Sequence, residues 1–579
     1  MQELTTDVLI LGSGGAGLFA ALHAHAAAPQ LDITIAVKGL LGKCGCTRMV
    51  QGGYNVAIAA EDSVERHFMD TIQGGAWLPH QELAWTLVKV AVERVHELEN
   101  ELGCFFDRNA DGTLHQKAFA GQTFDRTVHK GDLTGIEIIN RLAEQVWARG
   151  IRRLEEHRAV ELIASRDGSR IAGVLLLDMR TGEFVLARAR AVVLATGGGP
   201  TMYKYHTPSG DKACDGLAMA LRLGLPLRDM EMVQFHPTGL LAGVHTRMTG
   251  TVLEEGLRGS GGYLLNGKGE RFMQAVDPRA ERATRDIVSR AMFAEIRAGH
   301  VTPHGGLYIS MAHLGPAEVR RQFKGMVERC ADCGFDLAGG RVEVVPTAHY
   351  MMGGLEFRVD CTTELEGLFA AGEDTGGVHG ANRLGGNGVA NSTVYGGIAG
   401  ESVAAWLASP RTLAEPDRAA VERAHARTLH PFGQPAGDLP AIRDDLYELM
   451  WSEVGILRTG AGLAGAIETL ASLRERLART GLPDRERGFN LTWHDWLNLD
   501  SLIAVSEAIA HAAMAREDSR GAHFREDFPH TGDLAASAFT RVRQNGGGRA
   551  PEFSLEFVPV EFTHVRPGET LLEPTQRAA

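Results

Sequence analysis

The sequence predicts an α/β fold organised around a parallel sheet, and three glycine-rich stretches are the basis of this prediction. The first, Gly12-x-Gly14-x-x-Gly17, follows an apolar strand (7–11) and opens an alanine-rich helix, the setting that a dinucleotide fingerprint requires. The other two, 189–199 (ARAVVLATGGG) and 372–392 (GEDTGGVHGANRLGGNGVANS), also follow buried strands. We therefore expect these loops to meet around one long ligand.

The stretch 372–392 places an acid and an arginine in glycine-rich backbone. A strand (366–371) precedes it and a helix of small residues (394–408) follows, so backbone N–H groups and a helix N-terminus would gather at one point. Glu373 can accept hydrogen bonds from a ribose or ribityl hydroxyl, and Arg383 is a rigid cationic fork suited to a carboxylate or phosphate. The alternative interpretation is a glycine-rich loop with a surface arginine.

Composition limits the classes of function. A chain of 579 residues predicts two to four domains, and its formal charge of −13 without Lys/Arg runs argues against nucleic-acid binding. No stretch of 18 apolar residues or secretory signal is visible, so a cytoplasmic location is expected. The seven cysteines suggest reduced thiols. Cys330 and Cys333 form a lone CxxC pair that we interpret as structural, and no metal site is predicted.

The second predicted strand, 33–37, ends in Lys38, where an NAD site would carry an acid for the ribose. An ordinary NAD site is therefore disfavoured. A further glycine-rich segment, 43–58 (KCGCTRMVQGGYNVAI), follows.

A set of uncommon motifs runs along nearly the whole chain in one order. They are GSGGAGL (12–18), QGG (51–53), ATGGG (195–199), QFHPTGL (234–240), EGLRGSGGYLLNGKGERFM (255–273), RDIVSRAM (285–292), AHYMMGG (348–354), AGE (371–373), HGANRLGGNG (379–388) and SRGAHFREDFP (519–529). On these motifs the chain resembles the flavoprotein subunit family of succinate dehydrogenase and fumarate reductase, which also contains L-aspartate oxidase. The cofactor that this resemblance implies is FAD.

The resemblance implies a Rossmann-like FAD-binding domain with an inserted α+β capping domain, then a helical domain and a C-terminal tail domain. The expected boundaries are 1–232 and 351–418 for the FAD-binding domain, 233–350 for the cap, 419–530 for the helical domain and 531–579 for the tail. Heptad-like apolar spacing supports the helical domain, and alternation over 552–569 predicts strands in the tail. An Asn266-Gly267 turn predicts a hairpin in the cap.

The cofactor-binding residues implied by the resemblance lie mostly in the glycine-rich loops. They are Gly12, Gly14, Gly15, Ala16, Gly17, Lys38, Cys46, Thr47, Gln51, Gly52, Gly53, Ala159, Thr196, Gly197, Asp215, Glu373, Arg383, Gly388 and Val389. An N-cap role explains Asp215 equally well.

Interconverting a dicarboxylate and its alkene needs a hydride at flavin N5, cations on both carboxylates and a proton donor. By motif position, His236, His349 and Arg383 resemble the carboxylate ligands of the family, and Arg285 resembles its proton-transferring arginine. Glu255 and Arg258, three residues apart, could share a helical face and relay protons to Arg285.

Each of these residues also has a plainer interpretation. A lone histidine is more often a satisfied buried group than a ligand, and Arg285 could form a structural ion pair with Asp286. Their joint occurrence favours a site. Arg290 is the neighbouring alternative to Arg285, and Phe119 in FAGQ (119–122) resembles the loop that closes over the dicarboxylate.

Three positions depart from the family pattern. Cys46 stands where respiratory members carry the histidine that links FAD covalently, so we expect non-covalent FAD and a lower potential that favours alkene reduction; a cysteinyl link is the alternative. Glu254 replaces a substrate-binding threonine. Facing the pocket, it would repel a dianion unless it is protonated, or the substrate carries an amine or lacks one carboxylate. Ser260 replaces a glutamate.

The sequence thus predicts an FAD-dependent oxidoreductase of the fumarate reductase or succinate dehydrogenase type. The alternatives are an L-aspartate-oxidase-like enzyme and a flavin-binding electron-transfer component without dicarboxylate chemistry. The chain has no cysteine cluster for an iron–sulfur centre. We therefore expect electrons to pass through oxygen, a soluble donor or an iron–sulfur subunit, with any membrane association made through a partner protein.

Overall fold

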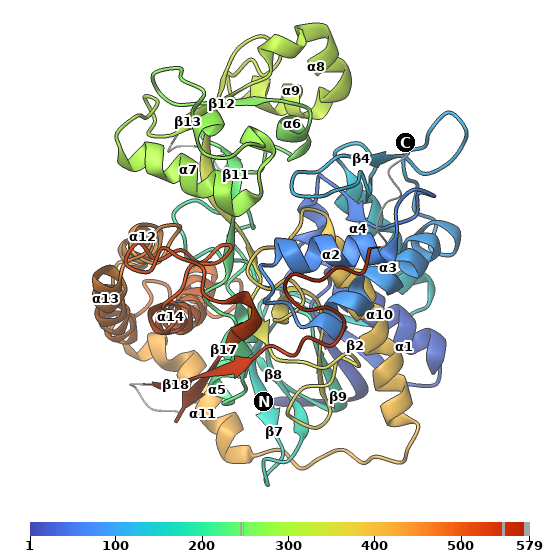
Figure 1. Ribbon diagram of the computed structural model, residues 1–579. Coiled ribbons are helices and arrows are strands. Elements are labelled where there is room, and N and C mark those ends of the chain that lie inside the picture. The colour runs from blue at the N-terminus through green and yellow to red at the C-terminus, as the bar shows by residue number, and fades with distance from the viewer. Residues whose placement is uncertain (244–245, 247, 547–550, 573–579) are drawn as a thin grey trace.

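A seven-stranded sheet forms the centre of the computed structural model, which describes residues 1–243, 246, 248–546 and 551–572 (Figure 1). The strand order is β6-β2-β1-β9-β8-β7, and β16 pairs with β9. The strands are β1 (Gln2–Leu11), β2 (Ile33–Val37), β6 (Arg152–Glu155), β7 (His157–Ala164), β8 (Ile171–Asp178), β9 (Phe184–Leu194) and β16 (Leu368–Ala370). β6, β2, β1, β9 and β16 run parallel, so the loops after β1, β9 and β16 meet at one edge, as the sequence predicts.

Four helices contact this sheet or one another around it: α1 (Gly15–Ala27), α3 (Gln81–Asn100), α4 (Thr134–Ala148) and α10 (Asn387–Leu407). Close packing of α1 requires glycine, because a Cβ on Gly17 would lie 2.1 Å from the Gly12 carbonyl oxygen and one on Gly396 would lie 2.6 Å from that of Ala16. α10 begins at Asn387, seven residues before the helix expected from sequence. Its N-cap, Gly386, has φ of +90°, a conformation that glycine adopts without strain.

Short elements complete the part of the chain before the cap. They are α2 (Val64–Gly74), α5 (Asp215–Arg222) and a three-stranded sheet of β3 (Tyr54–Asn55), β5 (Thr127–Val128) and β4 (Gln116–Lys117).

The capping region projects from the body of the molecule (Figure 1, green) and has its own hydrophobic core. Its sheet has the order β11-β14-β13-β12. The elements are β11 (Val233–Leu240), β12 (Tyr263–Leu265), β13 (Leu307–Ser310), β14 (Val342–Met351), α6 (Gly256–Gly259), α7 (Arg285–Arg297), α8 (Pro316–Gln322) and α9 (Lys324–Asp332).

The hairpin predicted at Asn266-Gly267 is wrong. β12 pairs with β13, in the register Tyr263↔Ser310, and the chain after the turn enters a 3₁₀ helix at Phe272–Ala275. The side chain of Asn266 explains the difference, because its Oδ1 accepts from Lys268 N and Glu270 N at 3.1 and 3.0 Å. This side-chain turn competes with a strand ladder.

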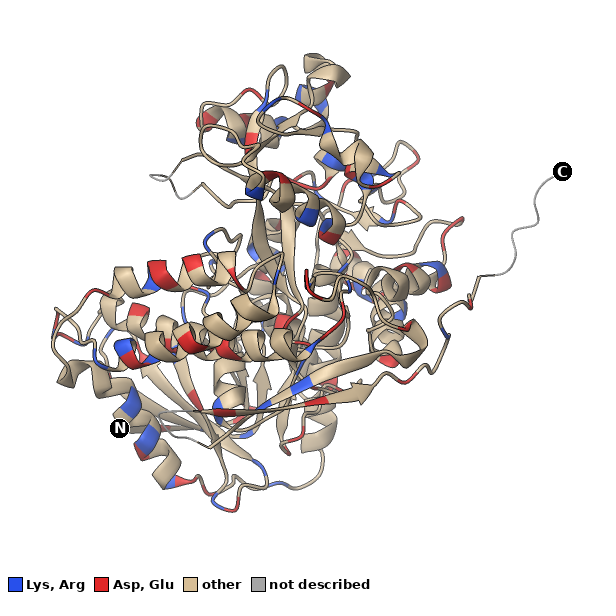
Figure 2. Ribbon diagram, turned by 60° about the vertical axis from the view of Figure 1, so that its left-hand side comes forward, with Lys and Arg blue, Asp and Glu red and all other residues tan. Residues whose placement is uncertain are grey.

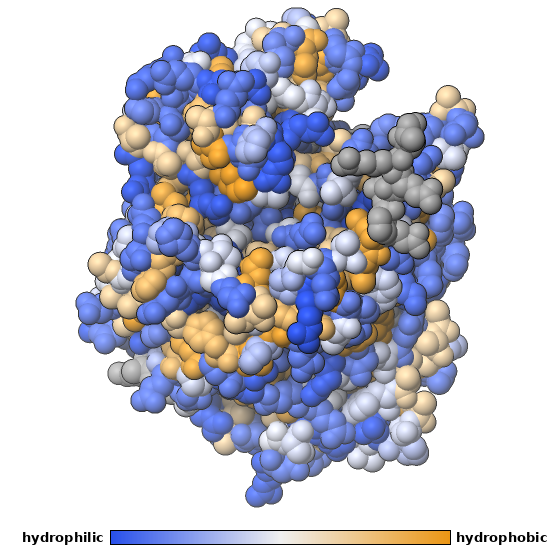
Figure 3. Space-filling view, viewed as in Figure 1, coloured by the Kyte–Doolittle hydropathy of each residue, from blue (hydrophilic) through white to orange (hydrophobic). Residues whose placement is uncertain are grey.

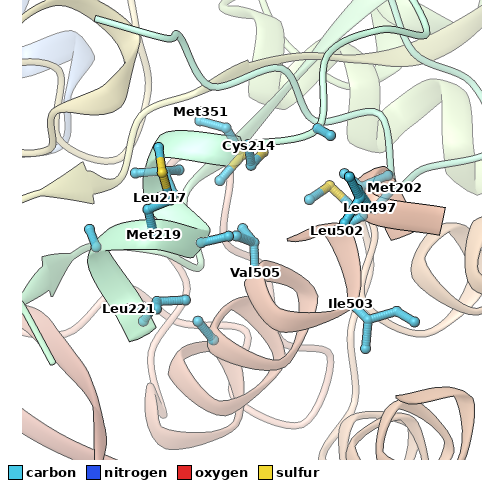
Figure 4. Close-up of a cluster of buried hydrophobic side chains, with 14 of the residues drawn as sticks. Met202, Cys214, Leu217, Met219, Leu221, Met351, Leu497, Leu502, Ile503 and Val505 are labelled. Atoms are coloured by element: carbon cyan, nitrogen blue, oxygen red, sulfur yellow. The ribbon is translucent and has the colours of Figure 1, made fainter. Parts of the chain in front are cut away.

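Helices α11 (Arg418–Leu429), α12 (Leu439–Ser452), α13 (Gly460–Ala478) and α14 (Leu491–Ala515) follow the second segment of the main sheet. Figure 4 shows Leu217 and Met219 of α5 facing Leu502 and Val505 of α14. These residues belong to one buried cluster that also includes strands of the main sheet. The helical region and the sheet therefore share a core.

The tail adds strands to the body of the molecule. β18 (Glu552–Pro559), predicted from the alternating pattern, pairs with β17 (Ala538–Asn545), and β17 joins β10 (Leu227–Arg228) and β15 (Gly354–Leu355) in one sheet. The chain then returns to α3, where Gln81 Nε2 donates to Val565 O at 2.7 Å. Residues 573–579 of the expected tail domain lie outside the described residues.

Acidic and basic residues are interspersed along the ribbon (Figure 2), and the hydrophobic residues on the face in Figure 3 form separate groups. Within the described ranges, no helix is long and apolar enough to cross a membrane.

Candidate active site

One cavity of about 680 Å³ extends from the fingerprint loop to the cap. Its wall includes every residue predicted to bind cofactor or substrate except Gly17, and it also includes Arg285 and Glu255. Gly17 instead packs α1 against the loop at Gly12. Arg258 lies behind Glu255, fully buried.

The nucleotide end of the cavity has the features of an anion site. The N-cap of α1 is Gly14, which has no side chain to cap the helix, and the first turn carries no acid. No charged group of the helix therefore neutralises the partial positive charge at its N-terminus. The segment 43–53 is held against it by one hydrogen bond, from Gly15 N to Thr47 Oγ1 at 3.0 Å.

Two buried polar atoms on the cavity wall support a bound cofactor. Gln51 Oε1 and Arg383 Nε have no hydrogen-bond partner among the residues that the structure describes. Buried polar atoms are nearly always paired, so a ligand with both a donor and an acceptor fits here. A dinucleotide with a polar ring system, lying along glycine backbone, meets this requirement.

Lys38 and Asp215 form a half-buried ion pair at the end of β2. Lys38 Nζ donates to Asp211 O, Asp215 Oδ2 and Asn498 Oδ1 at 2.6, 3.1 and 2.8 Å, which uses all three of its protons. Asp215 also accepts from Arg158 Nη2 at 2.6 Å. The N-cap of α5 is Cys214 and not Asp215, so the alternative N-cap role is wrong; the carboxylate joins ion pairs instead.

Two adjacent carboxyl groups, those of Glu373 and Asp374, lie in the loop after β16, at the edge of the cavity. Glu373 accepts from Met351 N at 3.0 Å and Gly199 N at 3.4 Å, and burial raises its pKa to about 7. Asp374 accepts from Thr196 Oγ1 at 3.0 Å, and burial raises its pKa to about 6. Glu373 is the one that lines the cavity.

Cys46 is a free cysteine on the cavity wall. Burial raises its pKa to about 12, so the side chain is a neutral thiol at pH 7.

Two neutral histidines lie at the cap end of the cavity. Their rings are 5.3 Å apart, His236 on β11 and His349 on β14, and burial holds the pKa of both well below the usual value. Thr238 N donates to His236 Nδ1 at 3.3 Å, which leaves the ring proton on Nε2 as a donor. His349 Nδ1 contacts Thr207 Oγ1 at 2.9 Å.

Arg383 is the least satisfied cation of the site. Among the described residues, its guanidinium makes one hydrogen bond, a long one of 3.4 Å from Nη1 to Leu384 O. The guanidinium lies 4.4 Å from the centre of the Tyr350 ring. Burial lowers its pKa to about 10, which still leaves it charged at neutral pH. A buried, unpaired guanidinium is suited to bind a carboxylate.

Arg285, Glu255 and Arg258 form a continuous chain of ion pairs. Glu255 Oε2 accepts from Arg285 Nε at 2.7 Å and also contacts Nη2, and its Oε1 accepts from Arg258 Nη2 at 2.7 Å. The two arginines hold the pKa of Glu255 below its usual value despite burial, which acts in the opposite direction. Gln234 Oε1 accepts from Arg285 Nη1 at 2.9 Å and fixes the guanidinium.

Glu254 lies on the cavity wall and is paired. Its Oε2 accepts from Lys117 Nζ at 3.1 Å, and Lys117 comes from β4, outside the cap. Burial raises the pKa of Glu254, against the effect of Lys117. Phe119 is also buried on the wall, packed against Gly52. Ser260 is exposed at the end of α6, and Arg290 contacts Asp286 and Gly521 away from the cavity.

Sequence reasoning missed Gln234, Tyr350 and Lys117. Gln234 lies two residues before His236 on β11, and period-two spacing could have placed it on the same face. Tyr350 directly follows His349. Lys117 has no sequence signal, because its partner is 137 residues away.

The glycine-lined cavity with a cationic inner end defines a flavoprotein oxidoreductase. Residues 7–389 match the FAD binding domain family, and residues 443–578 match the fumarate reductase flavoprotein C-terminal family. The chain therefore belongs to the succinate dehydrogenase and fumarate reductase flavoprotein family, which confirms the fold class and FAD as the cofactor.

Relatives from distant organisms align over most of the chain. One subunit of the fumarate reductase (CoM/CoB) of Methanothermobacter marburgensis is 41% identical, with 91% of this chain and 95% of the relative covered. The fumarate reductase flavoprotein subunit of Escherichia coli is 36% identical, with coverages of 91% and 89%. The solved quinol fumarate reductase of E. coli superimposes with a TM-score of 0.91 at 34% identity, covering 98% and 99% of the two chains. Mycobacterium smegmatis Sdh1 gives 0.87 at 35%, covering 97% and 95%.

Proposed function

We propose that this protein reduces the double bond of a small unsaturated dicarboxylate such as fumarate. One observation carries the proposal: two buried arginines, Arg285 and Arg383, lie with neutral His236 and His349 at the inner end of a cavity whose outer part is an FAD site.

The charges of this pocket match a dianion. Arg258 is balanced by Glu255, and Lys117 is balanced by Glu254. Glu255 also pairs with Arg285, so the chain Arg258–Glu255–Arg285 keeps one net positive charge; with both histidines neutral, Arg383 supplies the second. The concern that Glu254 would repel a second carboxylate is met by its partner Lys117.

We assign the substrate contacts to three side chains. Arg383 binds one carboxylate through its unpaired guanidinium, and His236 donates from Nε2–H, the proton position that Thr238 fixes. His349, held by Thr207, is the third ligand. Neutral histidine donors orient an anion without adding positive charge. The pocket would therefore select substrates by the positions of their carboxylates.

Proton delivery is assigned to Arg285. FAD, when bound, supplies the hydride. Arg285 would donate a proton to the other carbon, and the ionised carboxylate of Glu255 would return one to Arg285 by passing on a proton taken from Arg258, which is recharged from solvent. A free guanidinium has a pKa above about 12 and is a poor donor, so this role depends on the bonded carboxylate.

FAD is proposed to be held without a covalent bond. Cys46 occupies the position of the family's linking histidine, and its half-buried neutral thiol is a poor nucleophile. The absence of that link would lower the flavin potential and favour reduction of the alkene.

Electrons are proposed to enter through a partner. The Methanothermobacter relative is named as one subunit of its reductase, which supports assembly with an electron-carrying protein, iron–sulfur or other. Any location at the inner face of a membrane would come through that partner.

An L-aspartate-oxidase-like activity remains the second candidate, favoured by the carboxylate of Glu254 on the cavity wall, which suits a substrate ammonium. The flavin-binding component without dicarboxylate chemistry is disfavoured by the unpaired Arg383.

Anaerobic assays of the purified protein with a reduced or oxidised dye test the proposal. We expect turnover with fumarate as acceptor and slower oxidation of succinate. Arg383→Ala should lower kcat/KM for fumarate roughly 30- to 1000-fold, the scale of one lost charge-stabilising contact. Oxidation of aspartate with no fumarate turnover would establish the second candidate, and no turnover with any acid would refute both.

A further inference from the structure

Lys212 is a cation of the cofactor cavity that neither the motifs nor the ion-pair network accounts for. Its Nζ donates to one acceptor, Thr196 O, at 3.2 Å, and no carboxylate of the described chain lies within ion-pair distance. Lys38, on the same wall, is by contrast bonded to three acceptors. Lys212 is thus held in place by a backbone carbonyl and keeps its charge available to a ligand.

The position of Lys212 relates it to the fingerprint loop. A Cβ built on Gly45 would lie 3.8 Å from Gly14 Cα and 4.0 Å from Lys212 Nζ. The ammonium and the N-terminal loop of α1 therefore both adjoin Gly45, and all three line the same cavity. Gly45 itself has φ of +91°, and its lack of a side chain keeps this space open.

The ligand in this space must neutralise a cation and a helix N-terminus whose first N–H, that of Gly15, is bonded to the neutral hydroxyl of Thr47 and to no charged group. α1 contributes about half a positive charge through its free N–H groups, less than a diphosphate requires. The other basic residues of this part of the wall are engaged or exposed: Arg48 contacts Gly42 O and Asn140, Arg158 is paired with Asp215, and Lys43 is exposed.

We propose that Lys212 binds the diphosphate of FAD from the side opposite the N-terminus of α1. The helix supplies directional N–H donors and Lys212 supplies the full charge, so that the two phosphates lie between them. The inference rests on the FAD site and not on the identity of the substrate. Lys212 would therefore govern cofactor affinity and leave the reaction of the bound flavin unchanged.

Titration of apoprotein from riboflavin-limited cells tests this role. Lys212→Met should weaken FAD and ADP binding roughly 10- to 100-fold, the range for a lost charged hydrogen bond, and should flatten the dependence of the FAD Kd on salt. Riboflavin, which lacks phosphate, should bind Lys212→Met and parent alike. Lys212→Arg should recover much of the FAD affinity, and Lys204→Met, a surface lysine paired with Glu448, is the matched control.

Three results would overturn the proposal. One is an FAD Kd of Lys212→Met within threefold of the parent. A second is equal weakening of riboflavin binding and FAD binding. A third is an unchanged FAD Kd together with an altered midpoint potential of the flavin. Either of the last two results would assign the Lys212 ammonium to the isoalloxazine. The thermal midpoint of the apoprotein shows whether Lys212→Met folds. If it does not fold, binding of the same ligands to Lys212→Gln tests the proposal instead. All of these readouts are independent of turnover, so their failure is distinguishable from failure of the proposed activity.

Discussion

At the scale of single residues, the arginine and carboxylate of the ion-pair chain have separable roles. Arg285→Gln and Glu255→Gln should each lower kcat roughly 100- to 10,000-fold, the usual contribution of general acid catalysis. Arg285→Lys should fail as well, because one ammonium cannot reproduce the guanidinium contacts to Glu255 and Gln234. Steady-state turnover, with substrate binding to the oxidised protein measured separately, checks this prediction.

Arg290→Gln is the control for these variants, because Arg290 lies outside the cavity wall and should leave turnover near normal. Near-normal turnover of Glu255→Gln would rule out the relay, and near-normal turnover of Arg285→Gln would rule out Arg285 as the acid.

The pair of Lys117 and Glu254 predicts a charge-rescue experiment. Lys117→Met leaves the carboxylate of Glu254 unneutralised on the wall, so KM for a dicarboxylate should rise by roughly 10-fold, with a smaller change in kcat. Adding Glu254→Thr removes the charge and should return KM towards the parent value. A KM that stays within twofold in Lys117→Met would contradict the neutralising role of Lys117.

These residue-scale relations also mark the limit of sequence reasoning. The motifs brought His236, His349, Arg285 and Arg383 together correctly because each belongs to a strand or loop that the parallel sheet and the cap direct to one cavity. The pairing of Lys117 with Glu254 depends on a contact between separate regions, and no local pattern encodes it.

At the scale of elements, the crossing of α1 and α10 is predicted to tolerate no added atom. Gly396→Ala would place a Cβ 2.6 Å from the Ala16 carbonyl oxygen, so it should destabilise the protein by about 1 to 3 kcal/mol and weaken FAD binding through α1. Gly465→Ala, on the exposed side of α13 with no atom within 4 Å of the new Cβ, should stabilise by up to about 1 kcal/mol. Thermal midpoints of the two variants compare the effects, and equal shifts would contradict this account of the packing.

Glu507 on α14 predicts a pH-dependent effect on stability. Burial raises its pKa to about 7 from a usual value near 4.5, although it contacts Arg474. The folded state therefore binds more protons than the unfolded state between these values, and this carboxyl makes the protein less stable as pH rises through the window. The free energy of unfolding of Glu507→Gln, relative to that of the parent, should therefore be higher at pH 8 than at pH 5, by up to about 3 kcal/mol.

Urea midpoints of Glu507→Gln at the two pH values measure this difference, with the exposed Glu475→Gln on α13 as control. An equal stability difference at pH 5 and pH 8 would show that Glu507 stays ionised throughout.

The elements also show why some predictions from sequence held and others did not. β2 was predicted to the residue because an apolar run between turns has few alternatives. The hairpin after β12 failed because the side chain of Asn266 closes its own turn, and β12 pairs instead with a strand more than 40 residues later. The start of α10 was placed too late because its first turn is rich in glycine and asparagine, which favour loops in isolation.

At the scale of the whole molecule, the cofactor should be removable without cleavage of a bond. Acid precipitation of the purified holoprotein should release the yellow colour into the supernatant, because Cys46 is a neutral thiol and the linking histidine of the family is absent. Absorbance of the two fractions measures the release. Colour retained in the pellet of the parent and lost in Cys46→Ala would establish a cysteinyl flavin instead.

The place of α10 in the fold has a consequence for the order of events on the ribosome. The fingerprint loop and α1 emerge early, but the helix that packs across them begins at Asn387, after the whole cap. At typical synthesis rates about 370 further residues take roughly 20 to 75 s, during which the side of α1 that packs on α10 has no native cover. The cavity wall, which includes Gly386, Gly388, Val389 and Ser392, is therefore complete only when two-thirds of the chain has been made, and until then the side of α1 that packs on α10 is an exposed apolar surface on which aggregation can start.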